Sequence, residues 1–415
     1  MNILIPNWTW YPSGGDWTYV ENLNKFYTAR GHRVIPFSMH DERNFETEYK
    51  RYFIEKIDYK ELNKSKSLPN ALKSAKKTLY SAEAKKNITR LLDENHVDLV
   101  HINNIHHYLT PASILPVIKK RNIPVIWTLH DYVILCPNTT FVSKEQVCEK
   151  CFKTKYYSCV VNKCKKDSRA ASMMAAAESY VNHFLNPYKH VDYFVCPSAF
   201  IKQKFEQFGF RSEQLVHIYN LFDTAEITEQ SIQPAKRERD YLIYVGRIQR
   251  VKGILTLARA MKSKHVDLIV LGDGEERQEL ESLVQSEGLD NVKVLGKKPK
   301  KEVFELVSGS LFMVVPSEWY ENLPYSVVEA LAMEKPVLGA NIGGIPELVL
   351  DGKTGYLFEP GNAADLSQKI DLMLSDRPLL TQMGRQAREH ALKMVNYDSF
   401  GTALSGVFSS LGLNL

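Results

Sequence analysis

The stretch Glu321-Asn322-Leu323-Pro324-Tyr325-Ser326-Val327-Val328-Glu329 places two carboxylates eight residues apart around the start of a predicted helix. Pro324 suits the first helical position, where its missing N–H costs nothing, and the apolar-rich run 325–333 continues the helix. Glu321 then lies in the loop before the helix, where free backbone N–H groups favour anions, and Glu329 lies on the second turn. Glu321 is therefore suited to binding the hydroxyls of a ligand whose phosphate the helix end holds. The alternative is an acid that only complements the helix dipole.

Two cations upstream of this stretch, Arg247 and Lys252, favour the ligand-binding interpretation. The apolar run 241–245 (YLIYV) predicts a buried strand and residues 254–261 have helical spacing, so both cations lie on a strand-to-helix turn. In an open α/β sheet, ligands bind at the carboxyl ends of the strands, where such turns lie. A guanidinium fork and an ammonium group that converge there would hold a diphosphate. The alternative is a solvated basic turn, which we expect for Arg250.

Further short motifs follow in the same half of the chain, each of them weak by itself. They are Gly272-Asp273-Gly274 after the predicted strand 267–271, Pro316-Ser317 after 311–315, Gly343-Gly344-Ile345-Pro346-Glu347, and Asp351-Gly352-Lys353-Thr354-Gly355. Together with the Gly-Arg-x4-Lys-Gly and Glu-x7-Glu patterns they stand in one order between residues 246 and 355. On this joint pattern the chain resembles the retaining glycosyltransferases of the GT-B fold, in glycosyltransferase family 4 (glycosyl transferases group 1).

The resemblance implies a fold class and a domain organisation. The expected class is α/β: a GT-B fold of two Rossmann-like domains that face each other across a cleft, with a Cys-rich insertion in the first. The 415 residues agree with two domains of roughly 200 residues each. The expected parts are an acceptor-binding domain over 1–223 with the insertion at 136–164, a polar linker over 224–240, a nucleotide-sugar-binding domain over 241–396, and a C-terminal helix over 397–415 that crosses back to the first domain.

The resemblance also implies roles for individual residues. We expect catalytic roles for His130, Arg247, Lys252 and Glu321. We expect donor-binding roles for Gly14, Gly15, Gly246, Gly272, Asn322, Leu323 and Glu329. In this scheme the two cations stabilise the leaving diphosphate, Glu321 holds the sugar hydroxyls and Glu329 holds the ribose.

Two of these sites lie in the amino-terminal half. Gly14-Gly15 stands between a predicted strand (2–5) and a predicted helix (17–30), where glycines let the backbone approach a ligand, although a plain tight turn is the alternative. His130 follows the buried strand 124–129, and in the family a histidine at this place donates a hydrogen bond to the donor sugar. We expect Asp131 to fix either the tautomer of His130 or a loop backbone.

Five of the six cysteines lie between residues 136 and 164. Cys148-x2-Cys151 followed by Cys159-x4-Cys164 has the spacing of zinc ligands, and in a cytosolic chain a metal is favoured over disulfides. We therefore predict a structural zinc knuckle beside the acceptor cleft, with Cys136 as an alternative ligand. The other interpretation is a set of reduced thiols.

The sequence contains no Asp-x-Asp, so we expect no cofactor for catalysis. In line with the resemblance, we expect retention by front-face attack without a protein nucleophile. The expected partners are a nucleoside-diphosphate sugar of the UDP or GDP type and a glycan or lipid-linked acceptor, in bacterial cell-envelope polysaccharide synthesis. The net charge of +5 is mild and no Arg-rich aromatic footprint occurs, which argues against nucleic acid.

Residues 50–90 hold twelve Lys/Arg against four Asp/Glu, with aromatic residues between them. Such a surface is suited to an anionic membrane, although a solvated helical face is the alternative. Residues 1–5 predict a first strand rather than a signal peptide, and no apolar run is long enough to span a membrane. We expect a cytoplasmic protein that is peripheral on the inner face of the plasma membrane.

Two other classes of function compete with a transferase. A nucleotide-sugar epimerase or hydrolase on the same fold would need acid and base groups at the anomeric carbon, whereas Glu321 is better placed for hydroxyls. A non-catalytic module that binds lipid or a partner would not need Arg247, Lys252, Glu321 and Glu329 together.

Overall fold

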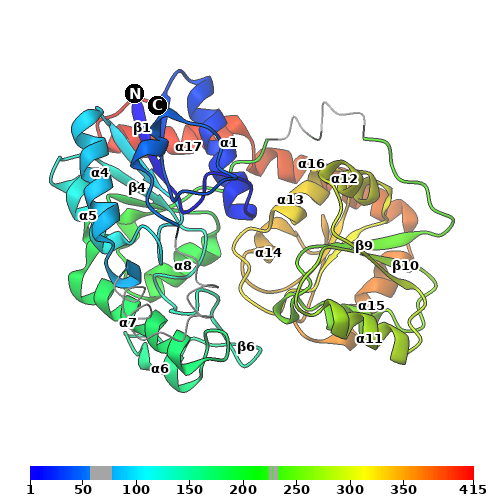
Figure 1. Cartoon of the computed structure of the whole chain (residues 1–415). Helices are drawn as coiled ribbons and strands as arrows, with labels where there is room; N and C mark the ends of the chain where they lie inside the picture. Colours follow the sequence, from blue (N-terminus) through cyan, green and yellow to red (C-terminus); the bar gives the residue numbers. More distant parts are fainter. Residues whose placement is uncertain (57–76, 224–226, 228–231) are drawn as a thin grey trace.

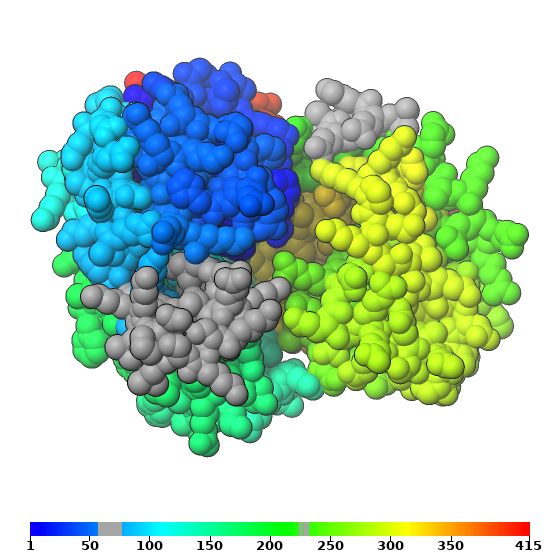
Figure 2. Space-filling model, viewed as in Figure 1, coloured from blue at the N-terminus to red at the C-terminus, as the bar shows by residue number. Residues whose placement is uncertain are grey.

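The structure is a computed structural model that describes residues 1–56, 77–223, 227 and 232–415. Residues 57–76 of the basic segment, and residues 224–226 and 228–231 of the predicted linker, lie outside the described residues. Figure 1 shows two α/β domains side by side, and Figure 2 shows that the surface is hollowed between them. Two parallel sheets confirm the predicted pair of Rossmann-like units.

The first domain is built on a six-stranded parallel sheet in the order β2-β1-β3-β4-β7-β8. Its strands are β1 (Asn2–Pro6), β2 (Arg33–Phe37), β3 (Leu99–Ile102), β4 (Val125–Thr128), β7 (Tyr193–Cys196) and β8 (Leu215–His217). Its helices are α1 (Gly15–Ala29), η1 (Glu48–Tyr52), α4 (Ala82–Glu94), α5 (Pro111–Lys119), α6 (Tyr157–Val161), α7 (Arg169–Leu185), η2 (Pro187–His190), α8 (Ala199–Gln207) and η3 (Ser212–Gln214). A short antiparallel hairpin joins β5 (Val142–Ser143) to β6 (Gln146–Val147).

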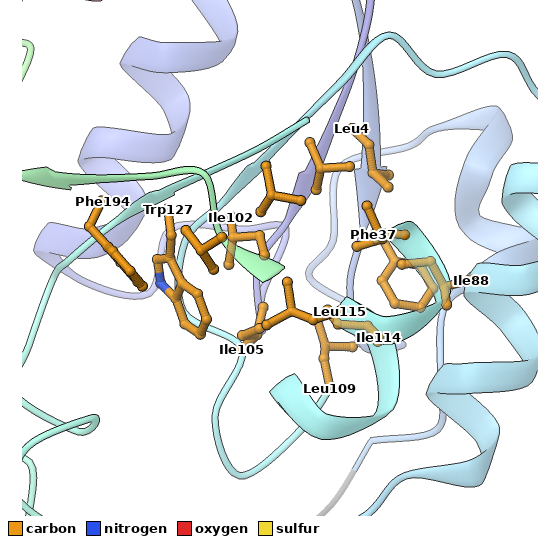
Figure 3. Close-up of a cluster of buried hydrophobic side chains, with 14 of the residues drawn as sticks. Leu4, Phe37, Ile88, Ile102, Ile105, Leu109, Ile114, Leu115, Trp127 and Phe194 are labelled. Atoms are coloured by element: carbon orange, nitrogen blue, oxygen red, sulfur yellow. The ribbon is translucent and has the colours of Figure 1, made fainter. Parts of the chain in front are cut away.

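The strands of this sheet are rich in apolar residues because helices cover both faces. Every residue of β3 and β4 is buried. Figure 3 shows one face, where Leu4 and Ile102 of the sheet pack against Ile88 of α4 and Ile114 of α5. A second cluster lies on the other face, under α1. The sheet therefore holds its carboxyl edge rigidly in place.

The second domain repeats this plan with the sheet order β11-β10-β9-β12-β13-β14, again all parallel. Its strands are β9 (Tyr241–Val245), β10 (Asp267–Leu271), β11 (Val292–Gly296), β12 (Met313–Val315), β13 (Val337–Ala340) and β14 (Gly355–Phe358). The helices that follow in sequence are η4 (Arg250–Lys252), α10 (Ile254–Ala260), α11 (Arg277–Ser286), α12 (Lys300–Gly309), α13 (Tyr325–Ala332), α14 (Ile345–Leu348), α15 (Ala363–Leu374), α16 (Arg377–Met394) and α17 (Tyr397–Ser410). Pro324 is the residue before α13 rather than its first helical residue, a correction of one position.

The C-terminal helix α17 packs on the first domain, beside β1 and α1 (Figure 1). Phe400 makes an edge-to-face contact with Phe26 of α1, with 5.0 Å between the ring centroids. Leu404 and Phe408 are fully buried in the same cluster. The chain therefore crosses between the domains a second time, which ties the second domain to the first.

Replacing Phe408 by Ala should lower the free energy of unfolding by about 3–5 kcal/mol, because the buried ring leaves a cavity between α17 and the first domain. Urea unfolding followed by circular dichroism measures the change. Leu372→Ala on α15, where the side chain is 44% exposed, is the control and should stay within about 0.5 kcal/mol of the wild type. An effect at Phe408 no larger than that of the control would contradict this packing.

Candidate active site

The carboxylate of Glu321 is buried and held by three donors. Its Oε1 accepts hydrogen bonds from Lys252 Nζ at 2.6 Å, Ser317 Oγ at 2.6 Å and Trp319 Nε1 at 2.9 Å. The residue is 6% exposed, so it is not a solvent-facing acid that only complements the dipole of α13. No described residue donates to the other oxygen, Oε2, which is left to accept from a ligand hydroxyl.

The charge of Glu321 depends on these partners. Burial by itself would raise its pKa, but the adjacent Lys252 ammonium and the hydrogen bonds from Lys252, Ser317 and Trp319 outweigh burial and lower the pKa. Glu321 is therefore an anion at neutral pH. From the sequence we expected Lys252 to bind a diphosphate. In the structure it pairs with Glu321, which lies 69 positions further along the chain. An ammonium group has three protons, so this pair leaves two for another acceptor.

Close backbone contacts fix the loops that present this pair. A Cβ at Gly343 would lie 2.4 Å from the carbonyl oxygen of Glu321, and a Cβ at Gly344 would lie 1.8 Å from that of Asn322. Gly344 N–H also donates to the Glu321 carbonyl at 2.8 Å. On the other side, a Cβ at Gly253 would lie 1.8 Å from the carbonyl oxygen of Pro316, after β12. Only glycine permits these approaches.

Arg247 joins the site from the same turn as Lys252 and reaches the first domain. The guanidinium Nη2 lies 3.6 Å from the position of a Cβ on Gly14, and a Cβ on Gly15 would lie 3.8 Å from the Tyr325 ring of α13. Arg247 is exposed and has no ion-pair partner within the described parts of the chain. The glycine loop before α1 thus faces the start of α13 and a free cation.

The other two glycines predicted to bind the donor are packed against each other. A Cβ at Gly272 would lie 1.8 Å from the carbonyl oxygen of Gly246, and Gly246 N–H donates to the carbonyl of Leu271 at 3.0 Å. These contacts bring the loops after β9 and β10 together at one edge of the sheet. The glycines therefore set the backbone path beside Arg247.

Asn322 connects the domains through its side chain. Its Oδ1 accepts from Ser198 Oγ at 3.0 Å, and its Nδ2 donates to the carbonyl of Leu129 at 2.8 Å. This contact brings the residue after Glu321 next to the residue before His130. The side chain of Leu323 lies in the core of the second domain and that of Glu329 is half-buried on α13. The donor-binding roles of these three residues stay predictions.

His130 is oriented by an asparagine rather than by the acid that follows it. Its Nε2 lies 2.8 Å from Asn103 Oδ1, and Asn103 Nδ2 donates to the carbonyl of His101. Nε2 is therefore the protonated nitrogen and Nδ1 is left as an acceptor. This reverses the hydrogen-bond role that the resemblance implied, in which His130 donates to the sugar. Burial lowers the pKa of His130 to about 4, so the ring is neutral at pH 7. Asp131 instead accepts from Val133 N–H, which is the loop-backbone role of the two expected for it.

Three acidic contacts between the domains were not foreseen. The Glu347 carboxylate accepts the backbone N–H groups of Ala199 and Phe200 at the start of α8, both at 2.8 Å. Glu149 accepts from the hydroxyl of Tyr320, the residue before Glu321, at 2.8 Å. Arg250, expected to be solvated, forms an ion pair with Glu145 of the β5–β6 hairpin at 3.2 Å and also pairs with acids at the start of α11. Each acid lies far from its partner in sequence, so no local signal predicts it.

The six cysteines are all free thiols. Cys151, Cys159 and Cys164 pack together with Tyr156 beneath α7. Within the described residues, no group of three or more His, Cys, Asp or Glu side chains is arranged to hold a metal ion. The described structure thus gives no support to a metal site at Cys148, Cys151, Cys159 and Cys164, with or without Cys136. The zinc knuckle and the reduced thiols both stay predictions.

The fold and this site define the class of two-domain glycosyltransferases with the GT-B fold. The family model described as Glycosyltransferase Family 4 matches residues 13–226, and the model described as Glycosyl transferases group 1 matches residues 226–390. The chain belongs to glycosyltransferase family 4, and the predicted transferase class is confirmed.

Individual relatives extend over different shares of the chain. It is 24% identical over 396 residues to an uncharacterized glycosyltransferase of Methanocaldococcus jannaschii, a match that covers 95% of this chain and 94% of the relative. It is 31% identical over 183 residues to N-acetyl-alpha-D-glucosaminyl L-malate synthase of Bacillus anthracis, covering 41% of this chain and 47% of that one. Against the second relative, the chain spans about half of the relative's length.

Solved structures match along the whole chain. Sucrose-phosphate synthase from Thermosynechococcus elongatus has a TM-score of 0.69 and 18% identity, and the match covers 99% of both chains. Anabaena HepE in complex with UDP and glucose has a TM-score of 0.67 and 19% identity, covering 99% of this chain and 100% of the other. These likenesses confirm the GT-B fold. They give no support to residues 136–164 as an insertion. Among the helices that the structure describes, none is long and apolar enough to cross a membrane.

Two buried histidines predict how stability depends on pH. Burial lowers the pKa of His101 and of His106 to about 3. Folding favours the neutral form of both rings. Their contribution to the free energy of unfolding is therefore complete above pH 6.5 and is lost as the pH falls from 6.5 towards 3. Each histidine should lower the free energy of unfolding by about 2 kcal/mol when the pH falls from 6.5 to 5, as measured by urea unfolding. In NMR titration their rings should stay neutral at pH 5, and a midpoint near 6.5 would contradict their burial.

Proposed function

We propose that this family 4 enzyme transfers a sugar, with retention, from a UDP- or GDP-sugar to a glycan or lipid-linked acceptor in bacterial cell-envelope polysaccharide synthesis. The observation that carries the proposal is the buried Glu321–Lys252 pair beside the free Arg247, at the place where the carboxyl edges of the two sheets meet. Ligands of open α/β sheets bind at such edges. Cations and an anchored carboxylate there suit a ligand with a diphosphate at one end and hydroxyls at the other.

Similar proteins support a nucleotide-sugar donor and a role in polysaccharide synthesis. HepE was solved with UDP-glucose. The lipopolysaccharide outer core galactosyltransferase WaaB shares the fold at a TM-score of 0.65. A 42.6 kDa protein of the cps region of Klebsiella pneumoniae is 27% identical over 361 residues, which cover 84% of this chain and 87% of that protein. Nucleotide-sugar chemistry and surface polysaccharide therefore recur among proteins that this chain resembles.

The proposed reaction uses the site residues to bind and to stabilise charge. The bond between the sugar carbon and the diphosphate oxygen breaks while the acceptor oxygen attacks from the same face. The acceptor proton passes to the leaving phosphate oxygen. Arg247 and the two remaining Lys252 protons stabilise the negative charge that develops there. Glu321 Oε2 accepts from a sugar hydroxyl, Glu329 binds the ribose, and the neutral His130 offers Nδ1 as an acceptor towards the sugar.

Calorimetric titration with UDP and GDP tests the diphosphate site. One of the two nucleotides should bind the wild type, and Arg247→Ala should weaken it by roughly tenfold or more, because one charge-assisted contact is worth about 1.5–3 kcal/mol. Arg259→Ala is the matched control, since Arg259 is an exposed cation on α10 of the same domain. Equal loss in both variants, or none in either, would remove Arg247 from the site.

A chelator tests the claim that catalysis needs no metal. Donor turnover should be unchanged in EDTA, because Arg247 and Lys252 supply the positive charge for the leaving group. Loss of turnover that magnesium or manganese restores would contradict this. Elemental analysis of the untreated protein should show no zinc if the cysteines are reduced thiols. One equivalent of zinc would instead favour the zinc knuckle that the cysteine spacing predicted.

A further inference from the structure

An unusual share of the exposed apolar side chains lies on one short segment of the first domain. Of the nine large hydrophobic side chains that are exposed within the described residues, six lie between residues 152 and 185. They are Phe152, Tyr157, Val161, Met173, Phe184 and Leu185. Val161 is 71% exposed and Phe184 is 80% exposed. Single exposed hydrophobic residues are ordinary, but a group of them marks an interaction surface.

Five of these six side chains lie on two adjacent helices, α6 and α7, where the half-buried Tyr180 joins them. Met173, Tyr180 and Phe184 of α7 are spaced by seven and four residues, which places them on one side of the helix. Tyr180 stacks on Phe184 with 6.5 Å between the ring centroids. On α6, Tyr157 and Val161 are four residues apart, and Tyr157 N–H donates to the Tyr180 hydroxyl at 3.3 Å. The side chains of the two helices therefore meet at Tyr180.

The exposed cations of the same segment lack acidic partners in the described structure. Exposed between residues 152 and 190 are Lys153, Lys155, Lys163, Lys166, Arg169 and Lys189. No described carboxylate forms an ion pair with any of them, and Asp167 is the one exposed acid in that range. In the described part of 50–90, by contrast, five of the seven cations have an acidic partner, and Lys85 and Lys86 have none among the described residues. The six apolar residues and six cations together make up the basic–apolar surface.

We propose that the basic–apolar surface docks on an anionic lipid bilayer. Helices that lie in the membrane interface carry aromatic and aliphatic residues on one side and Lys or Arg along its borders. Free cations are attracted to anionic headgroups, while the apolar side chains enter the acyl boundary. The surface lies at the end of the first domain opposite both termini, where α6 and α7 run side by side (Figure 1).

The location of this surface has a consequence for the acceptor. It belongs to the first domain, which is expected to bind the acceptor, whereas the donor cations belong to the second. Docking would hold the acceptor domain at the membrane and favour an acceptor carried by a lipid. This last step rests on the proposed function, while the docking itself does not.

Vesicle co-sedimentation of the full chain tests the docking. The wild type should bind phosphatidylcholine–phosphatidylglycerol vesicles, bind phosphatidylcholine vesicles far less, and lose binding as salt is added. Lys163→Glu and Lys166→Glu should each lower the partition coefficient by about fivefold or more, since one cation near the surface contributes about 1 kcal/mol. Phe184→Ser should lower it at both low and high salt, because it removes apolar contact.

Matched controls come from the second domain. Lys301→Glu on α12 and Leu372→Ser on α15 also change exposed residues, and they should leave vesicle binding unchanged. Nucleotide binding by all variants reports that they are folded. Should the wild type bind no nucleotide but still bind vesicles, the proposed function fails and the docking stands.

Three results would overturn the proposal. One is absence of binding to the anionic vesicles at low salt. A second is vesicle binding that Phe184→Ser and the lysine variants reduce no more than the controls do. A third is a dimer, detected by light scattering, that Phe184→Ser dissociates in the absence of vesicles, because the surface would then be covered by a second copy of the chain.

Discussion

The burial of the Glu321 carboxylate is the constraint on which the site depends. An unpaired buried charge costs several kcal/mol, so the carboxylate is stable only while Lys252, Ser317 and Trp319 all donate to it. The loop that holds Glu321 must therefore lie in backbone contact with the two loops that contain Gly253 and Gly344. The absence of a Cβ at these two glycines makes the contacts sterically feasible. The same contacts leave one carboxylate oxygen without a protein donor. The geometry that satisfies the charge therefore also prepares it to bind a ligand.

The position of one domain relative to the other follows from the same stretch of chain. Asn322, directly after Glu321, is bound to Ser198 and to the carbonyl of Leu129 in the first domain. Glu347, in the segment that begins with Gly343-Gly344, binds the free N–H groups at the start of α8. A carboxylate at a helix start gains from both the hydrogen bonds and the helix dipole. The loops that hold Glu321 are thus also the loops that join the domains.

The sequence was enough to predict secondary-structure elements whose signal lies within a few neighbouring residues. The runs 241–245 and 267–271 became strands with the same bounds, because strands buried on both faces are rich in apolar residues. The sequence was not enough to predict side-chain partners that are far apart along the chain. Lys252 was recognised as a site cation but not as the partner of Glu321, and Asn103 rather than Asp131 orients His130. Cysteine spacing describes the chain and not the positions of the thiols in space, so spacing alone does not decide whether they hold a metal, and the described structure gives the predicted zinc knuckle no support.

Whether a cation is paired within the protein says more about where an anionic ligand or membrane can bind than the net charge of +5 does. In the turn after β9, Arg250 is paired with three acids, Lys252 is paired with Glu321 but keeps two protons for a ligand, and Arg247 has no acidic partner in the described structure. On α6, α7 and the segments beside them, the cations have no acidic partners in the described structure and stand next to exposed apolar side chains. A charge already paired within the protein gains little from a new partner, whereas an unpaired one retains its full attraction. The same physical criterion therefore selects Arg247 as the unpaired cation for a compact anion, beside the Lys252 ammonium, and the basic–apolar surface for a bilayer.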